Sequence, residues 1–82
     1  MKYNVSLSHE AGKELERLDK AIKTQILKKL VELEENPHLG KPLSNVLKNN
    51  FSLHVGKYRI IYTIRQRDIV IARVAHRKEA YY

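Results

Sequence analysis

Hydrophobic and polar residues alternate at the start of the chain and then recur at helical spacing. Tyr3, Val5 and Leu7 share one side of residues 3–7, and this period of two residues predicts a half-buried strand. From there to Glu35 the apolar residues recur every three to four positions, which predicts two amphipathic helices. The apolar stripes consist of Ala11, Leu15 and Leu18 in the first helix and Ile22, Ile26, Leu27, Leu30, Val31 and Leu33 in the second.

Short polar residues mark the expected ends of these helices. Ser8 and Asp19 stand where N-caps are predicted, and Glu10 lies in the first turn, where the helix dipole favours an acid. Asn36-Pro37 ends the second helix, because proline restricts the residue before it and cannot continue the helix. The short connection around Asp19 predicts that the two helices form an antiparallel hairpin.

The rest of the chain is rich in strand patterns. Residues 38–50 are expected to form a loop up to Pro42, followed by an ambiguous segment that could hold one helical turn. Residues 51–55, 58–65 and 69–75 alternate or are β-branched, and turns separate them, which predicts three strands. A strand, two helices and three strands predict an α+β fold, with the helices packed on one face of a small, mostly antiparallel sheet.

Alternation within the last two strands predicts that the sheet has two different faces. We expect the helices to cover the apolar sets, which are Tyr58, Ile60, Tyr62 and Ile64 in one strand and Val70, Ala72 and Val74 in the other. The open face would then carry four arginines, Arg59, Arg65, Arg73 and Arg77. A single bulge would reverse this assignment, because it shifts the alternation by one residue.

Length and composition narrow the class of protein. The 82 residues predict a single domain spanning residues 1–82. The absence of cysteine excludes disulfides, thiolate zinc sites and cysteine nucleophiles, and it favours the reducing cytoplasm. The longest run without a charged residue, 49–56, is far shorter than the ~20 apolar residues that a membrane-spanning helix needs. We therefore expect no membrane segment, and the N-terminus lacks the apolar block of a signal peptide.

Positive charge is concentrated in the second half of the chain. Residues 1–42 contain eight basic and seven acidic residues, a net charge of +1, whereas residues 43–82 contain eight basic and two acidic residues, a net charge of +6. Five of the eight are arginines, whose guanidinium group matches phosphate oxygens in a bidentate geometry. This asymmetry favours a phosphate-bearing partner, and the alternatives are an acidic protein partner or a solvated face.

Few kinds of catalysis fit the remaining residues. The four histidines lie far apart without nearby carboxylates, and no glycine-rich phosphate loop exists, so we expect neither a metal nor a cofactor. One kind of catalysis does fit: cleavage of RNA by attack of its 2′-OH on the adjacent phosphate. The residues suited to it are His76, Arg77 and Tyr81, with Lys78 beside them and Arg59 on a neighbouring strand. Each of these residues alone could have a purely structural role, as a solvated strand residue, a residue at a strand end or part of a frayed terminus. Only their joint placement favours catalysis.

Two segments of the second half resemble a known family. The two segments are residues 56–62, GKYRIIY, and residues 69–81, IVIARVAHRKEAY. They resemble the RelE/ParE toxin superfamily and are most similar to its RelE branch. The resemblance covers the whole chain, including the first strand and the two helices. It implies the toxin of a type II toxin–antitoxin system, which cuts mRNA in the ribosomal A site and is blocked by a cognate, RelB-like antitoxin.

The resemblance also implies roles for individual residues. The catalytic residues would be Arg59, Arg77, Tyr81 and His76. For an mRNA endonuclease we further expect, from their charge and not from the resemblance, that mRNA and ribosomal RNA are held by Lys41, Lys48, His54, Lys57, Arg65, Arg73 and Lys78.

The sequence departs from the family pattern at one functional position. RelE toxins place two lysines on the second strand, one of them a general base, and Asn50 and Ser52 occupy those positions here. The candidates for the base are His76, His54, Lys41, Lys48 and Lys57. Two other functions stay open: a ParE-like inhibitor of DNA gyrase, and a non-catalytic module that binds nucleic acid.

Overall fold

The computed structural model describes residues 2–43 and 49–79, and it confirms the predicted α+β fold. The ambiguous segment of the sequence lies largely outside this described part. The elements are β1 (Asn4–Leu7), α1 (His9–Glu16), α2 (Lys20–Glu35), β2 (Lys41–Pro42), β3 (Asn50–Val55), β4 (Tyr58–Arg65) and β5 (Asp68–His76).

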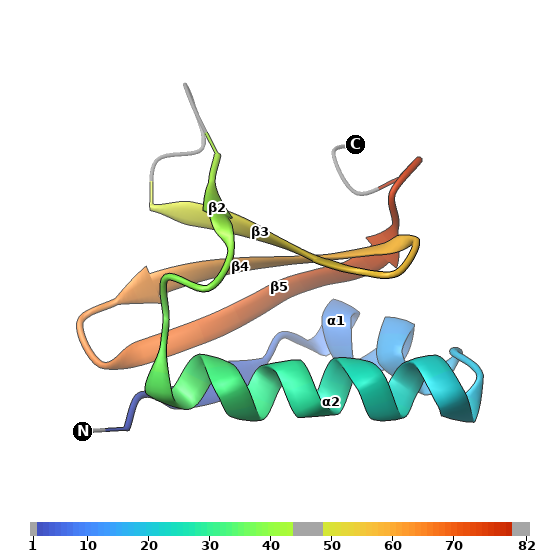
Figure 1. Ribbon diagram of the computed structural model, residues 1–82, viewed down its shortest axis with the longest axis horizontal. Helices are drawn as coiled ribbons and strands as arrows, with labels where there is room; N and C mark the ends of the chain where they lie inside the picture. Colours follow the sequence, from blue (N-terminus) through green and yellow to red (C-terminus); the bar gives the residue numbers. More distant parts are fainter. Residues whose placement is uncertain (1, 44–48, 80–82) are drawn as a thin grey trace.

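The strands form one sheet in the order β1-β5-β4-β3-β2. β1 runs parallel to β5 and the other pairings are antiparallel, as the prediction of a mostly antiparallel sheet requires. Both helices lie on one side of this sheet, with α2 running along its length (Figure 1). The prediction of a plain loop up to Pro42 is wrong, because Lys41 and Pro42 pair with Ser52 and Phe51 as an edge strand. An edge position tolerates proline, which has no N–H to donate.

The helix ends follow the local signals in the sequence. The Ser8 side chain accepts a hydrogen bond from the Ala11 N–H at 3.0 Å, as an N-cap should. Asp19 occupies the N-cap position of α2 without a side-chain cap bond, and α2 ends at Glu35, with Asn36 before Pro37 as its C-cap. No helix in the described part of the chain is long and apolar enough to cross a membrane.

The core lies between the helices and the sheet. From α2 it takes Ile26, Leu30 and Leu33, each of which contributes on the order of 2 kcal/mol when buried. The apolar stripe is narrower than predicted, because the side chains of Leu27 and Val31 are 44% and 61% exposed. From the sheet the core takes Val55, Ile60, Tyr62, Ile69, Ile71 and Val74.

A bulge in β5 changes which residues face the core. Consecutive residues of β4 pair with Arg73 and Ile71, so Ala72 is the extra residue on β5. Ile71 before the bulge and Val74 after it are both buried in the core. The predicted alternation is therefore wrong for Val70, which lies on the open side, because the extra residue shifts the alternation by one.

Candidate functional site

Arg59 lies on the open face of the sheet, near the start of β4. Its cross-strand neighbours are His54 on β3 and Ala75 on β5. Because Ile60 is fully buried in the core, the preceding side chain points to the opposite face. The Arg59 Nε atom is buried and has no hydrogen-bond partner among the described residues. Buried donors are nearly always paired in native proteins, so this unpaired donor marks a position suited to an anion.

His54 adds a proton-transfer group beside this arginine. The tight turn at Gly56-Lys57 joins β3 to β4 and places His54 directly opposite Arg59. Partial desolvation and the positive charges of Arg59 and Lys41 lower the pKa of His54 below its usual value of 6.5. The imidazole is therefore neutral at neutral pH, and a neutral imidazole has a nitrogen able to accept a proton.

Lys41 is brought to the same face by an anchored loop. It pairs with Ser52, which precedes His54 by two residues and so shares its face. The loop before Lys41 is held by the fully buried Tyr62. The Tyr62 hydroxyl accepts a hydrogen bond from the Gly40 N–H at 2.9 Å and donates one to the Pro37 carbonyl at 2.8 Å. A core residue thus fixes the strand that carries the lysine.

An open pocket of about 250 Å³ lies where this loop meets β3. His54 and Lys41 both contribute to its wall, so the proton-transfer group and one of its neighbouring cations face the same hollow. The lining residues are Leu39, Gly40, Lys41, Ser52, Leu53 and His54.

Arg77 lies at the same end of the sheet. Its backbone N–H donates a 2.8 Å hydrogen bond to the Lys57 carbonyl, which holds the end of β5 against the turn between β3 and β4. Figure 1 shows the end of β5 beside this turn. Lys57, Arg77 and Lys78 are all exposed here. We call the group formed by Lys41, His54, Lys57, Arg59 and Arg77 the basic corner.

His76 faces the other side of the sheet. It pairs with Tyr58 across the strands and shares the alternation of Val74, which points into the core. The rings of His76 and Tyr58 meet edge to face at 5.7 Å, and the His76 Nδ1 accepts the Lys78 N–H at 3.2 Å. His76 is therefore near Arg77 in the chain, but its ring is directed away from the basic corner.

Arg73 is engaged by α1 and does not form part of a free basic face. Its guanidinium group contacts Glu14 at 2.8 Å and Glu10 at 3.0 Å. The hydrogen bond that Arg73 donates to Glu14, together with the negative charges of Glu14, Glu10 and Glu79, raises the pKa of Arg73 despite some desolvation. The sequence predicted four arginines on the open face. Arg73 alternates with the core residue Val74, as that prediction requires, but its guanidinium group is paired with Glu10 and Glu14 of α1.

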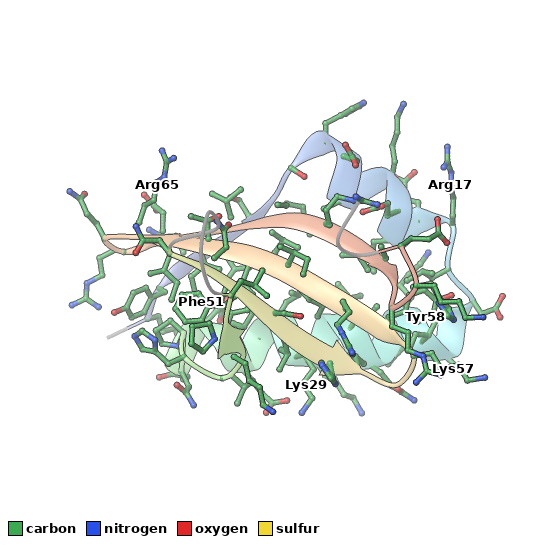
Figure 2. The ribbon with its side chains drawn as sticks, turned by 90° about the horizontal axis from the view of Figure 1, so that it is seen from above. Arg17, Lys29, Phe51, Lys57, Tyr58 and Arg65 are labelled. Carbon is green, nitrogen blue, oxygen red and sulfur yellow. The ribbon has the colours of Figure 1, made fainter. Side chains whose placement is uncertain are left out.

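Other predicted site residues lie apart from the basic corner or outside the described residues. Arg65 is at the far end of β4, and Figure 2 shows it at the opposite end of the sheet from Lys57. Lys48 and Tyr81 lie outside the described residues. The corner therefore unites four of the predicted basic residues with His54 and leaves out Arg65, Arg73 and His76. Lys78 follows Arg77 in the chain and is exposed beside the corner.

Sequence reasoning missed the supports of this site. The anchoring role of Tyr62 depends on contacts with residues more than 20 positions away, so no local pattern indicates it. The pairing of His54 with Arg59 could have been found, because a two-residue turn at Gly56-Lys57 fixes the register of the hairpin.

The chain is similar to known toxins along almost its whole length. A family model described as the ParE toxin of type II toxin–antitoxin systems matches residues 5–81. A RelE-like toxin protein of Escherichia coli is 34% identical over 92% of this chain and 81% of its own length. Toxin RelE of Mycobacterium tuberculosis is 34% identical over 96% of this chain and 86% of its own length.

A solved structure agrees with these matches in sequence. A chain of the toxin–antitoxin complex RelBE2 of Mycobacterium tuberculosis matches this protein with a TM-score of 0.85 and 31% sequence identity. The match covers 93% of this chain and 99% of the chain in that complex. Fold and sequence together define a toxin of a type II toxin–antitoxin system. The chain belongs to the RelE/ParE toxin superfamily, and its relatives of 34% identity carry the RelE name.

Proposed function

We propose that this toxin is a ribosome-dependent endonuclease that cuts mRNA in the ribosomal A site and so stops translation. The names of its relatives support the RelE type of activity. The observation that carries the proposal is the buried, unpaired Nε of Arg59 at the basic corner, a donor suited to a phosphate. In the proposed reaction the nucleophile belongs to the RNA itself, so no metal-bound water has to supply it.

The arginines would act on the phosphate that reacts. Attack by the 2′-OH adds negative charge to the phosphate oxygens, and Arg59 and Arg77 would stabilise that charge as it develops. Tyr81, which the family resemblance assigns to catalysis, would take part in moving protons. Lys57 and Lys78 are exposed at this end of the sheet and would hold ribosomal RNA.

We propose a RelB-like antitoxin as the protein partner. The similar structure of 31% identity is a toxin–antitoxin complex, which supports such a partner for this chain. An antitoxin segment with acidic residues over the basic corner would occupy the site that RNA needs. The action on ribosomes implies that the protein works in the cytoplasm.

Three single variants test this function. We expect Arg59→Ala and Arg77→Ala to reduce cleavage by about 10² to 10³ fold, because each removes a group that stabilises the transition state. Arg17→Ala is the matched control, since it removes the same charge from an exposed position at the C-terminal end of α1. The measurements are growth after induction and the mapping of mRNA ends on reconstituted ribosomes. Full toxicity of both variants, with unchanged cleavage, would show that the proposed mechanism is wrong.

A ParE-like inhibitor of DNA gyrase is the second candidate, because the matching family model is described by the ParE toxin. The two functions give different responses to induction. A gyrase inhibitor would trigger DNA damage signalling and leave mRNA intact, and its toxicity would not depend on Arg59. An mRNA endonuclease would stop protein synthesis first and leave new ends in translated messages.

A further inference from the structure

The proposed cleavage requires a group that removes the proton from the 2′-OH. The family places a lysine at this step, and this chain has Asn50 and Ser52 at those positions. A replacement must lie on the same face as Arg59 and must have a free lone pair. These two requirements can be tested against the geometry of each candidate.

Most candidates fail one of the requirements. Lys41 on β2 is separated from Arg59 by β3, and Lys57 lies in the turn between β3 and β4, so neither is directly opposite Arg59. Each would also have to lose the proton of its ammonium group before it could accept another. His76 points to the helix-covered side of the sheet, and its Nδ1 already accepts the Lys78 N–H. Lys48 lies outside the described residues.

His54 meets both requirements. It is exposed, lies directly opposite Arg59 and lines the open pocket, so an RNA strand on this face can reach its ring. The charged groups that act on it from neighbouring strands are Lys41 of β2 and Arg59 of β4, and both are cations. With partial desolvation they disfavour the imidazolium form, which leaves the ring with a free lone pair at neutral pH.

We propose that His54 is the proton acceptor of the cleavage reaction, a role that rests on the proposed function. A ring nitrogen of His54 takes the proton of the 2′-OH while the 2′-oxygen forms a bond to the adjacent phosphorus. The bond from phosphorus to the 5′-oxygen breaks, and that oxygen takes a proton from a general acid or from water. The products are a 2′,3′-cyclic phosphate and a 5′-hydroxyl end, and no oxidant, reductant or co-reactant is consumed.

The test measures cleavage of a defined mRNA on reconstituted ribosomes at saturating ribosome concentration between pH 5 and 8.5. We expect the wild-type rate to rise with pH through a pKa below 6.5 and then level off, because the neutral imidazole is the active form. His54→Gln should lower the plateau about 10² to 10⁴ fold and remove the rising limb. His9→Gln is the matched control, since His9 is exposed at the start of α1.

A second variant separates a catalytic role from a structural one. His54→Ala should lose activity, retain its melting temperature and regain part of its rate when imidazole is added to the buffer. If the wild-type protein cleaves mRNA and the His54→Gln variant has the same rate and pH profile, this inference is wrong and the proposed function stays intact. Loss of activity without rescue by imidazole would also overturn it. A wild-type protein that leaves mRNA uncut would instead refute the proposed function.

Discussion

The hydroxyl of Tyr62 offers a direct test of how the core supports the basic corner. This hydroxyl pairs with the Gly40 N–H and the Pro37 carbonyl, and all three residues are buried. Tyr62→Phe removes one oxygen atom and keeps the ring, including its stacked contact with Phe51 at 5.4 Å. Two backbone groups then lose their partner in a place that water does not reach.

The expected cost follows from those two groups. A buried donor or acceptor left unpaired costs about 1 to 3 kcal/mol, so for two such groups we expect the free energy of unfolding to fall by about 2 to 6 kcal/mol. For a chain of 82 residues this is a large part of a total of about 4 to 12 kcal/mol. With a urea m-value of about 2 kcal/mol/M, the urea midpoint should fall by about 1 to 3 M.

The same hydroxyl predicts a dependence of stability on pH. Burial raises the pKa of Tyr62 above 10.0, partly offset by the Gly40 hydrogen bond. When the pKa of a group is higher in the folded than in the unfolded state, the protonated group stabilises the fold at every pH below the unfolded pKa. This contribution is lost as the pH rises through the pKa of the folded state. The wild-type protein should therefore lose stability above about pH 10, and Tyr62→Phe should lack this contribution.

Urea unfolding followed by circular dichroism measures both effects. The matched control is Tyr58→Phe, because the Tyr58 hydroxyl has no hydrogen-bond partner among the described residues and its removal should cost little. If Tyr62→Phe is as stable as Tyr58→Phe, the loop from Pro37 to Gly40 does not depend on this anchor. The argument that a core residue positions Lys41 would then be refuted.

Two further predictions concern the contacts that support the open face, and three substitutions test them. Glu14→Ala should cost about 2 to 4 kcal/mol, because its carboxylate accepts the buried Val74 N–H at 2.7 Å and also pairs with Arg73. Glu10→Ala removes a partner that is 66% exposed and should change the urea midpoint little, so equal effects of the two would contradict this reasoning. Gly40→Ala should also destabilise, because its Cβ would lie 2.8 Å from a tyrosine hydroxyl and 2.9 Å from a backbone carbonyl. A Gly40→Ala protein with wild-type stability would show that this loop can move away.

Local signals in the sequence were sufficient for most of the fold. Ser8 predicts the start of α1 because capping depends only on residues within one turn. The turn at Gly56-Lys57 fixes the register between β3 and β4 for the same reason, since Gly56 adopts a φ of +61° that suits glycine. These predictions succeeded because each rests on neighbouring residues.

The parts that could not be predicted depend on contacts between distant segments. The bulge at Ala72 is held where α1 meets β5: the Ser8 hydroxyl donates to the Ala72 carbonyl, and Glu14 accepts the Val74 N–H. No periodicity within β5 reveals these partners. The alternation therefore failed for Val70, although it succeeded for Arg59, whose strand has no extra residue.

The positions of the arginines explain why net charge alone is a poor guide to the site. Arg73 is neutralised by Glu14 and Glu10, so it contributes to stability more than to an open basic surface. Arg59 differs from Arg73 because its Nε is buried without a hydrogen-bond partner among the described residues. The free-energy cost of removing that donor from water is therefore not offset by a contact within the described structure. A fold that keeps such a donor unpaired gives up stability there, and an anion bound at the basic corner would recover it. Our proposal of a phosphate at this corner therefore rests on one uncompensated donor and its cationic neighbours, and the excess of basic residues in the chain is a weaker argument for it.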